Sequence, residues 1–314
     1  MFSENLRKRR LELGMSQGEL AEKAGYRSRS SITKLESGTS DIPQKKLRLL
    51  AEALNTTPEE LIGGERLSFL RTESKAKGGS ERESRVIVLI QAGGKSTRNM
   101  LSIPSQFVNV DEKPIIAYTM EAYERHPLVD EINIVCVYGW EKTLQSYAEK
   151  YHISKLNSII TGGRTIIDSV KLGMNHLKKT VRDNDVIILQ EATRPMISTG
   201  LISKIISSYN EFGASVFVKP MTEYVQIEIE KGNAKMCNRN LLFSIESPEI
   251  YSVGTLQNAL DRQKKEAPDD GSCCAVMMDR LGMPLHYCES NAVNLKIVRQ
   301  EDVYYFKVLK QVLL

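Results

Sequence analysis

The stretch Val86-Ile87-Val88-Leu89-Ile90-Gln91 runs directly into Ala92-Gly93-Gly94-Lys95-Ser96-Thr97-Arg98. A short apolar, β-branched run that ends at paired glycines predicts a fully buried parallel strand followed by a tight loop. Glycine lets the backbone approach a ligand closely, and successive N–H groups can then point at phosphate oxygens. The loop also delivers two cations, Lys95 and Arg98. The stretch therefore predicts a nucleotide site, although paired glycines after a strand also form ordinary turns.

The bulk composition is that of a globular protein with room for two domains. The chain has 314 residues, of which 41% are hydrophobic and 26% charged, and its net charge of +4 permits an anionic partner without requiring one. No apolar run approaches the roughly 20 residues of a membrane helix, and the N-terminus lacks the apolar core of a signal peptide. The five cysteines follow neither a disulfide framework nor a zinc-ligand spacing. We therefore expect a cytoplasmic protein.

Composition divides the chain into residues 1–65, a linker at 66–85, and residues 86–314. The linker is rich in charge, Gly and Ser and has no apolar period. Beyond it, strand-like and helical patterns alternate, which favours an α/β domain with a mainly parallel sheet covered on both faces. The predicted strands are 86–91, 132–138, 158–161, 186–190, 215–218, 226–230, 242–244 and 285–288. The predicted helices are 116–125, 143–150, 165–178, 201–212, 253–263 and 301–312.

Residues 1–65 contain sequence signals for the starts and ends of short helices. Ser16-Gln17-Gly18-Glu19 has the spacing of a capping box and predicts a helix from Gln17 to Ala24. A second helix over 30–36 ends near Gly38, which suits a left-handed cap, and Thr57-Pro58 predicts another helix start. The apolar positions predict a small all-α core of Leu6, Leu13, Leu20, Ala21, Ile32, Leu35, Leu47, Leu50, Ala51, Leu54 and Leu61.

These positions carry a resemblance to the phage-repressor (Cro/C1, xenobiotic-response-element) helix-turn-helix. The matching residues are Leu6, Arg10, Gly14-Met15-Ser16-Gln17, Leu20-Ala21, Ile32, Leu35-Glu36-Ser37-Gly38, Pro43, Leu50-Ala51 and Leu54. The resemblance implies that the second helix of the motif enters the major groove of double-stranded DNA. By position it implies DNA contacts by Gln17, Arg27, Arg29, Ser30, Ser31 and Lys34. An extra residue within 26–29 leaves the base-contact register open. The alternative is a small helical interaction module whose charges are merely solvated.

A second resemblance rests on seven motifs taken in order. They are Pro104-Ser105-Gln106-Phe107, Lys113-Pro114-Ile115-Ile116, Gly162-Gly163-Arg164 with Asp168-Ser169-Val170, Gln190-Glu191-Ala192-Thr193-Arg194-Pro195, Asn238-Arg239-Asn240, Glu246-Ser247-Pro248-Glu249 and Asn294-Leu295-Lys296-Ile297. Over residues 85–314 the chain resembles the methylerythritol-phosphate and ribitol-phosphate cytidylyltransferases, with the ribitol-phosphate branch favoured by 140–154 and 238–240. The resemblance implies a Rossmann-like fold, a homodimer, and transfer of CMP from CTP to a sugar or polyol phosphate with Mg²⁺ bound to the leaving pyrophosphate.

The resemblance also implies roles for individual residues. Those implied at the nucleotide are Ala92, Gly93, Gly94, Gly163, Ser169, Glu191 and Arg194. Those implied in catalysis are Arg98, Thr222, Arg239 and Lys296. Lys95 is added to the catalytic candidates from its place in the loop, at a position that is not usually basic in the resembled enzymes. Within these sets, the resemblance implies that Lys296 contacts the α-phosphate and that Glu191 occupies the position of the metal-side aspartate. It implies that Thr222 and Arg239, on an arm of the opposite subunit, contact the acceptor phosphate. As single residues, Arg194 could equally cap a strand end and Lys296 could be a solvated surface lysine.

Several positions depart from the pattern of the resembled enzymes. A lysine that stabilises the transition state is Ser105 here, the second loop glycine is Ser96, an aspartate is Glu191, and the segment Gln-Thr-Pro-Gln is Glu246-Ser247-Pro248-Glu249. Losing a preorganised charge donor costs about 10²–10³ in rate. Lys95 is a candidate to replace the missing cation.

Three interpretations follow from the matches and the departures. The first is an active cytidylyltransferase with its own DNA-binding module. The second is a transcriptional regulator whose degenerate enzyme domain senses CTP or a CDP-linked metabolite. The third is a structural fusion in which the α/β domain only dimerises the helix-turn-helix. The cluster of Arg98, Arg194, Arg239 and Lys296 argues against the third, and we favour the enzyme over the sensor.

Overall fold

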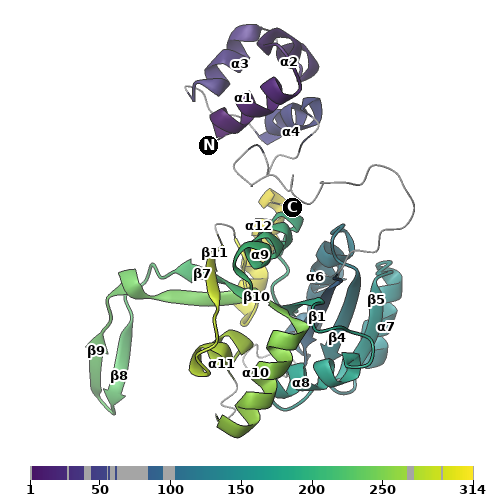
Figure 1. The fold of residues 1–314 in the computed structure, drawn as a ribbon, viewed down its shortest axis with the longest axis vertical. Coiled ribbons are helices and arrows are strands. Elements are labelled where there is room, and N and C mark those ends of the chain that lie inside the picture. The colour runs from purple at the N-terminus through teal and green to yellow at the C-terminus, as the bar shows by residue number, and fades with distance from the viewer. Residues whose placement is uncertain are drawn as a thin grey trace. The chain divides into compact units, whose positions relative to one another are not determined.

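The computed structural model describes residues 2–26, 28–38, 44–54, 56, 61, 84–94, 103–266, 272–290 and 293–313. The chain divides into two compact units, Met1–Gly79 and Ser80–Leu314 (Figure 1). The linker boundaries at 65 and 85 stay predictions.

The first unit is helical, with α1 (Phe2–Glu12), α2 (Gln17–Lys23), α3 (Arg29–Glu36) and α4 (Gln44–Ala53). The predicted capping box is present, because the Glu19 N–H donates to Ser16 Oγ at 3.2 Å and the Ser16 N–H donates to Glu19 Oε2 at 2.7 Å. Gly38 follows α3 in the left-handed region at φ +70°. The helix start predicted at Thr57-Pro58 lies outside the described residues.

The predicted core of this unit is correct at ten of its eleven positions, each of which is buried. The prediction is wrong for Leu13, which is 38% exposed. The physical reason is local. Helix α1 ends at Glu12 and the chain turns at Gly14, so the helical period no longer directs residue 13 inward.

The second unit contains a seven-stranded sheet in the order β11-β7-β10-β6-β1-β4-β5. The strands are β1 (Val86–Ala92), β4 (Glu131–Cys136), β5 (Leu156–Thr161), β6 (Val186–Glu191), β7 (Ser215–Pro220), β10 (Phe243–Ser252) and β11 (His286–Glu289). The pairs β1–β4, β1–β6, β4–β5 and β7–β11 are parallel, whereas β10 runs antiparallel to both β6 and β7. The prediction of a mainly parallel α/β sheet is confirmed.

Helices cover both faces of the sheet, as the alternation along β1 requires. Val86, Val88 and Ile90 belong to one core, which they share with side chains of α6 (Ile115–Glu124), α7 (Glu141–Lys150) and α9 (Thr199–Phe212). Ile87 and Leu89 belong to the opposite core, which they share with α8 (Ile166–Leu177), α10 (Val253–Glu266) and α11 (Cys274–Arg280). The last helix, α12 (Gln300–Leu313), packs through Phe306 onto a smaller cluster with Ile115 and Ile297.

The strand order contains a switch point. From β1 the chain proceeds outward through β4 to β5, and it then returns to place β6 on the other side of β1. Ligands of doubly wound sheets bind in the crevice that such a reversal opens at the carboxyl ends of the strands. Here that crevice lies where β1 ends at Ala92 and β6 ends at Glu191.

Strand β10 is much longer than predicted. The strand expected at 242–244 is only its beginning, because β10 continues to Ser252 with an irregular register between Glu246 and Glu249. Proline and two carboxylates within a short segment indicate a break in a strand. The sheet accommodates them at the bulge, where both Glu246 and Glu249 are buried.

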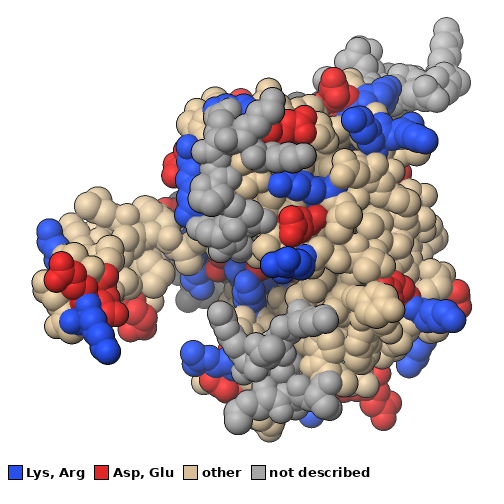
Figure 2. Space-filling view, turned by 90° about the horizontal axis from the view of Figure 1, so that it is seen from below, with Lys and Arg blue, Asp and Glu red and all other residues tan. Residues whose placement is uncertain are grey.

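A two-stranded hairpin, β8 (Gln226–Glu230) and β9 (Asn233–Met236), extends from the body of this unit as an arm (Figure 1). All of its strand residues are exposed, including Ile227, Ile229 and Met236. Figure 2 shows the arm as a protrusion with a cluster of acidic and basic side chains on a largely uncharged surface. None of the described helices is long and apolar enough to cross a membrane.

Candidate active site

The candidate site begins at the carboxyl ends of β1 and β6. Gly93 and Gly94 directly follow β1, and Glu191 is the last residue of the neighbouring strand β6. Gln106 Nε2 donates to the carbonyl oxygen of Ala92 at 2.7 Å and to that of Gly94 at 3.2 Å, so a buried amide holds the start of the loop. Lys95 and Arg98 lie outside the described residues, and their roles stay predictions.

Glycines bring the loop before α8 against the loop after β1. A Cβ on Gly162 would lie 3.2 Å from Gly93 Cα, and one on Gly163 would lie 2.5 Å from Asp168 Cβ. The second distance excludes any side chain at residue 163. The Gly163 N–H donates to Ser169 Oγ at 3.1 Å, and Ser169 is buried. The structure therefore brings together Gly93, Gly163 and Ser169, the residues predicted to hold the nucleotide.

Glu191 is the centre of an ion-pair cluster. Its Oε2 accepts from Arg194 Nε at 2.7 Å, and its Oε1 accepts from Lys296 Nζ. Arg194 is almost fully buried, whereas the Lys296 side chain is 43% exposed and is the most accessible member of the cluster. Glu191 and Arg194 are neighbours in the sequence, and the fold brings Lys296 to them from 105 residues away.

Two opposing effects act on the Glu191 carboxylate. Burial by itself raises the pKa of Glu191, because it penalises the charged form. The charges of Arg194 and Lys296, with their hydrogen bonds, outweigh that effect and hold the pKa of Glu191 below its usual value. The carboxylate is therefore ionised and available to a cation at neutral pH.

The segment that carries Lys296 is fixed on both sides of the lysine. Asn294 Nδ2 donates to the Ser247 carbonyl at 2.7 Å, and the Asn294 carbonyl accepts from Arg194 Nη1 at 2.7 Å. One residue beyond Lys296, the Ile297 N–H donates to the Thr193 carbonyl at 2.8 Å. Asn294 Oδ1 is buried and has no hydrogen-bond partner in the described part of the chain.

Two further carboxylates occupy the bulge of β10. Glu246 accepts from Ser290 Oγ at 2.8 Å and lies 3.7 Å from Arg194 Nη1. Glu249 accepts from Tyr251 Oη at 2.7 Å and from the Ala275 N–H at 2.9 Å. Burial raises the pKa of Glu249 to about 7. The sequence placed both glutamates in a motif but assigned neither a role.

Thr222 and Arg239 lie at the root of the arm. Arg239 Nη1 donates to the Thr222 carbonyl at 3.1 Å, and the guanidinium stacks on Tyr224 at 4.7 Å from the ring centroid. In the described residues of one chain, none of their hydrogen bonds reaches Glu191, Arg194 or Lys296. The prediction that they serve the site of an opposite subunit stays a prediction.

In the helical unit, α3 presents a polar face. Arg29, Ser30 and Lys34 are exposed and Ser31 is partly exposed, while Arg27 lies outside the described residues. The sequence analysis missed Thr33, which is exposed one turn beyond Arg29 and belongs to the same face. The helical spacing from Arg29 was the available signal.

Gln17 connects α2 to α3 rather than standing free. Its Nε2 donates to Glu36 Oε2 at 2.8 Å, and its Oε1 accepts from Arg29 Nε at 3.2 Å and from Thr33 Oγ1 at 3.1 Å. Glu36 is in turn bound by Arg10, whose Nε lies 2.6 Å from Glu36 Oε1. This chain of contacts orients Arg29 at the start of α3.

Comparison with known proteins agrees with both units. The model of the family described as 2-C-methyl-D-erythritol 4-phosphate cytidylyltransferase matches residues 86–309, and a helix-turn-helix family model matches residues 6–61. The chain belongs to the 2-C-methyl-D-erythritol 4-phosphate cytidylyltransferase family. It carries in addition a helix-turn-helix DNA-binding domain at its N-terminus.

Relatives from the cytidylyltransferase family align with this chain over nearly their whole length. A ribitol-5-phosphate cytidylyltransferase of Lacticaseibacillus paracasei is 31% identical over 71% of this chain and 96% of its own. A 2-C-methyl-D-erythritol 4-phosphate cytidylyltransferase of Clostridium botulinum is 30% identical over 69% of this chain and 93% of its own. In fold, the chain resembles a 4-diphosphocytidyl-2C-methyl-D-erythritol synthase of Anaerococcus prevotii with a TM-score of 0.60, 17% identity, and coverage of 73% and 99% of the two chains.

The family site contains donors that suit Mg²⁺. Among the described residues there is no group of three or more His, Cys, Asp or Glu side chains placed to hold a metal. Nucleotide-bound Mg²⁺ does not need one, because it takes one or two carboxylates and completes its shell with phosphates and water. The ionised Glu191 and the orphaned Asn294 Oδ1 are hard oxygen donors of that class. The residues present therefore fit the cation.

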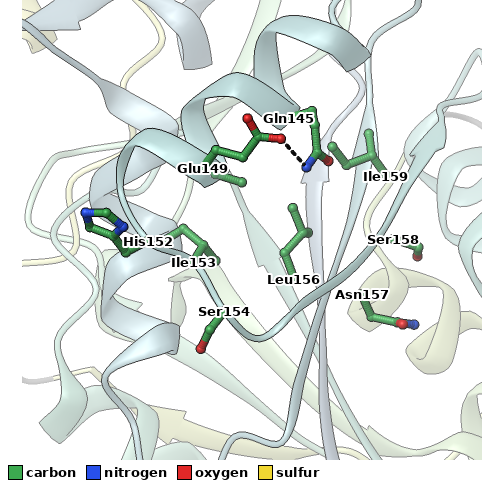
Figure 3. Close-up of a pocket in the computed structure, with 10 residues that line it drawn as sticks. Gln145, Glu149, His152, Ile153, Ser154, Leu156, Asn157, Ser158 and Ile159 are labelled. Carbon is green, nitrogen blue, oxygen red and sulfur yellow. Dashed lines mark hydrogen bonds between the residues drawn. The ribbon is translucent and has the colours of Figure 1, made fainter.

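One pocket of about 470 Å³ lies away from the family site, between α7 and the edge strand β5 (Figure 3). It contains none of the predicted site residues. Gln145 and Glu149 hydrogen-bond each other at 3.0 Å, and no cluster of charges converges in it. Among the described residues, this pocket therefore does not coincide with the ion-pair cluster at Glu191.

Proposed function

We propose that the α/β domain transfers CMP from CTP to a sugar or polyol phosphate of the ribitol 5-phosphate or methylerythritol 4-phosphate type, and releases pyrophosphate. The observation that carries this proposal is the ion-pair cluster of Glu191, Arg194 and Lys296. It lies at the switch point beside the glycine-lined backbone of Gly93 and Gly163. The activities for which the 31% and 30% identical relatives are named support this substrate class.

In this proposal, glycine-rich backbone binds the nucleotide. Ala92, Gly93 and Gly94 with Arg98 hold the triphosphate, and Gly163 with Ser169 lines the cytosine pocket, where backbone groups read the edge of the base. Gln106 keeps the first loop in place through its bonds to Ala92 and Gly94. Backbone N–H groups at such turns suit phosphate oxygens because they supply donors without a competing side chain.

The reaction needs positioning and cationic stabilisation more than covalent chemistry. An oxygen of the acceptor phosphate attacks the α-phosphorus of CTP, a new P–O bond forms, and the bond to the β-phosphate oxygen breaks. Lys296 turns from Glu191 to the α-phosphate as negative charge builds up there, while Arg194 stays with Glu191. Lys95 is the candidate to replace the cation lost at Ser105.

Glu191, together with the nucleotide phosphates, would hold the Mg²⁺ ion of this proposal. When bound, the ion would neutralise charge on the leaving pyrophosphate. Lys296, on moving to the phosphate, would leave Oε1 of Glu191 without its present partner. Arg194, which is fixed by the Asn294 carbonyl, keeps the carboxylate in place during the exchange.

We further propose a homodimer in which the arm of one subunit completes the site of the other. The arm exposes Tyr224, Ile227, Ile229, Met236 and Leu241, each at least 58% accessible, and apolar surface of this kind marks an interface. Thr222 and Arg239 at the arm's root would then meet the acceptor phosphate. A twofold dimer also suits the helix-turn-helix, whose dimers bind symmetric sites in double-stranded DNA through Gln17, Arg27, Arg29, Ser30, Ser31 and Lys34.

Pyrophosphate release tests the enzymatic proposal. The full chain is incubated with CTP, Mg²⁺ and a panel that includes ribitol 5-phosphate and methylerythritol 4-phosphate. We expect turnover with at least one acceptor, and a fall of about 10²–10³ in rate for Lys296→Met. The control is Lys307→Met on α12, which removes an exposed lysine that pairs with Asp111 and should leave the rate unchanged.

A second function, ligand sensing without turnover, is favoured by one observation. Ser105 stands where the resembled enzymes have a catalytic lysine, and it is 2% exposed. Micromolar CTP binding without pyrophosphate release across the acceptor panel would support the sensor and overturn the enzyme. Absence of any binding of cytidine nucleotides would overturn both.

A further inference from the structure

The inference concerns how the segment that carries Lys296 is held. This segment leaves β11 at Ser290 and reaches α12 without regular secondary structure over residues 293–298. Backbone hydrogen bonds of a helix or strand therefore do not position the lysine. Its anchoring contacts are instead made by the side chains of Ser290 and Asn294 and by the backbone N–H of Ile297.

Glu246 binds two of these anchors at once. Its Oε2 accepts from Ser290 Oγ at 2.8 Å and from Asn294 Nδ2 at 3.3 Å. Its Oε1 lies 3.7 Å from Arg194 Nη1, the same nitrogen that donates to the Asn294 carbonyl. Glu246 is therefore connected to Asn294 directly and through Arg194, and it acts on Lys296 only through these residues.

A carboxylate suits this position better than an amide. The three neighbouring groups of Ser290, Asn294 and Arg194 are all donors, and an ionised carboxylate has only acceptors to offer them. A glutamine would direct an NH₂ group at one of these donors, in a place that is 8% exposed and offers little water as a replacement. The family pattern has glutamine here, so the glutamate is a feature of this chain.

We propose that Glu246 is a positioning residue, which binds Ser290 and Asn294 and so holds residues 293–297 with Lys296 facing the phosphate of a bound nucleotide. The role rests on the proposed cytidine nucleotide site, and it deepens that proposal by naming what fixes its central cation. Glu246 acts through Asn294 and Arg194. Its removal should therefore matter only while Lys296 is present.

The test is a double-mutant cycle on nucleotide binding by the full chain. CTP with Mg²⁺ is titrated by calorimetry into the wild type, Glu246→Gln, Lys296→Met and the double variant. We expect Glu246→Gln to weaken binding about tenfold in the wild-type background and less than twofold in the Lys296→Met background. An equal change in both backgrounds would overturn the proposal, because Glu246 would then act independently of the lysine.

Glu249→Gln is the matched control. It makes the same chemical change on the same strand, at a buried carboxylate that binds Tyr251 and Ala275 rather than Ser290 and Asn294. We expect it to change the affinity less than twofold. An effect as large as that of Glu246→Gln would show that any loss of charge in the bulge is enough, and would also overturn the proposal.

Hydrogen exchange separates this proposal from the proposed function. If the wild type binds no cytidine nucleotide, the enzymatic proposal fails, and the positioning role is then tested at the amide of Ile297, which donates to Thr193. We expect exchange of this amide to accelerate at least tenfold in Glu246→Gln and not in Glu249→Gln. Unchanged protection in both variants would show that Glu246 does not hold the segment.

Discussion

The two units hold their candidate functional side chains in opposite ways. On α3, Arg29, Ser30 and Lys34 are exposed, and side chains that meet DNA in the groove need to be free of the protein core. In the α/β unit, Glu191 and Arg194 sit at the carboxyl edge of the sheet within a network of ion pairs. The first arrangement suits contact with a large external partner, and the second suits electrostatic binding of a small ligand.

This contrast predicts that substitutions on the exposed face of α3 change DNA binding without changing stability. Substitutions in the cluster at Glu191 should change both function and stability. Loss of an exposed DNA-contacting side chain should weaken binding and leave folding intact. Loss of a buried ion-pair partner should do both, since it leaves a charge without compensation in a poorly solvated place. The single tryptophan of the chain, Trp140, stacks on Phe107 in the α/β unit, and its fluorescence reports unfolding of that unit alone.

The largest effect is expected for Arg194→Met. It removes the guanidinium that binds Glu191 Oε2 at 2.7 Å and the Asn294 carbonyl at 2.7 Å. Breaking a buried pair costs about 3–5 kcal/mol, and the remaining Lys296 partner places the expected loss near the lower value. Urea unfolding followed by Trp140 fluorescence measures the change.

Arg125→Met is the control for Arg194→Met. Arg125 makes an exposed helical pair with Glu121 at 3.4 Å, and its side chain is 66% exposed. Such pairs contribute about 0.5 kcal/mol or less. Equal losses for the two variants would show that the cluster at Glu191 is no more than a surface ion pair.

The next effect concerns Glu249, a buried carboxylate whose partners include no cation. Burial raises the pKa of Glu249 from its usual 4.5 to about 7. The folded state therefore binds a proton that the unfolded state releases between these values, and stability falls as the pH rises from 4.5 to 7. The full cost above pH 7 is about 3 kcal/mol.

Glu249→Gln should remove this dependence while keeping an oxygen to accept from Tyr251 and Ala275. Between pH 5 and pH 8, the free energy of unfolding of the variant is expected to rise by about 3 kcal/mol relative to that of the wild type. The same unfolding assay measures it. Glu211→Gln on the exposed surface of α9 serves as control and should track the wild type. Parallel curves for Glu249→Gln and wild type would contradict the assigned shift.

The comparison of units also shows what sequence patterns could predict. The strand predicted over 86–91 is β1, and the core predicted in residues 1–65 is correct except that it includes the exposed Leu13 and omits the buried Ala24. These features depend on local periodicity, which is determined by residues that are close in the sequence. Gly163 was identified through the resemblance, and the structure gives the reason for a glycine there, because a Cβ would lie 2.5 Å from Asp168 Cβ.

Features that depend on distant partners were missed. Polar residues at Glu246-Ser247-Pro248-Glu249 concealed the continuation of β10, because their burial is compensated by Arg194, Ser290 and Ala275, far away in the chain. The same reason explains why Glu246 and Asn294 received no role. The resemblance placed Glu191, Arg194 and Lys296 in one site, whereas spacing in the sequence alone could not have joined them.

The smallest effect is expected for Arg29→Ala, on the exposed face of α3. A duplex selected by the full chain from a random pool provides the probe, and fluorescence anisotropy at fixed salt measures its affinity. Arg29 is exposed, and Gln17 Oε1 orients it through a 3.2 Å bond, so its removal should cost about 1–2 kcal/mol of binding, roughly tenfold in affinity.

Arg29→Ala should leave the thermal unfolding of the helical unit unchanged, because its contacts lie outside the buried core of Leu20, Ile32 and Leu35. Gln17→Ala should weaken DNA binding less than Arg29→Ala, since it removes an uncharged proposed contact and loosens the orientation of an arginine that is still present. Lys23→Ala, an exposed residue at the end of α2, should change neither property. If Arg29→Ala destabilised the unit as much as it weakened DNA binding, the exposed face of α3 would be part of the scaffold, and the contrast between the two units would disappear.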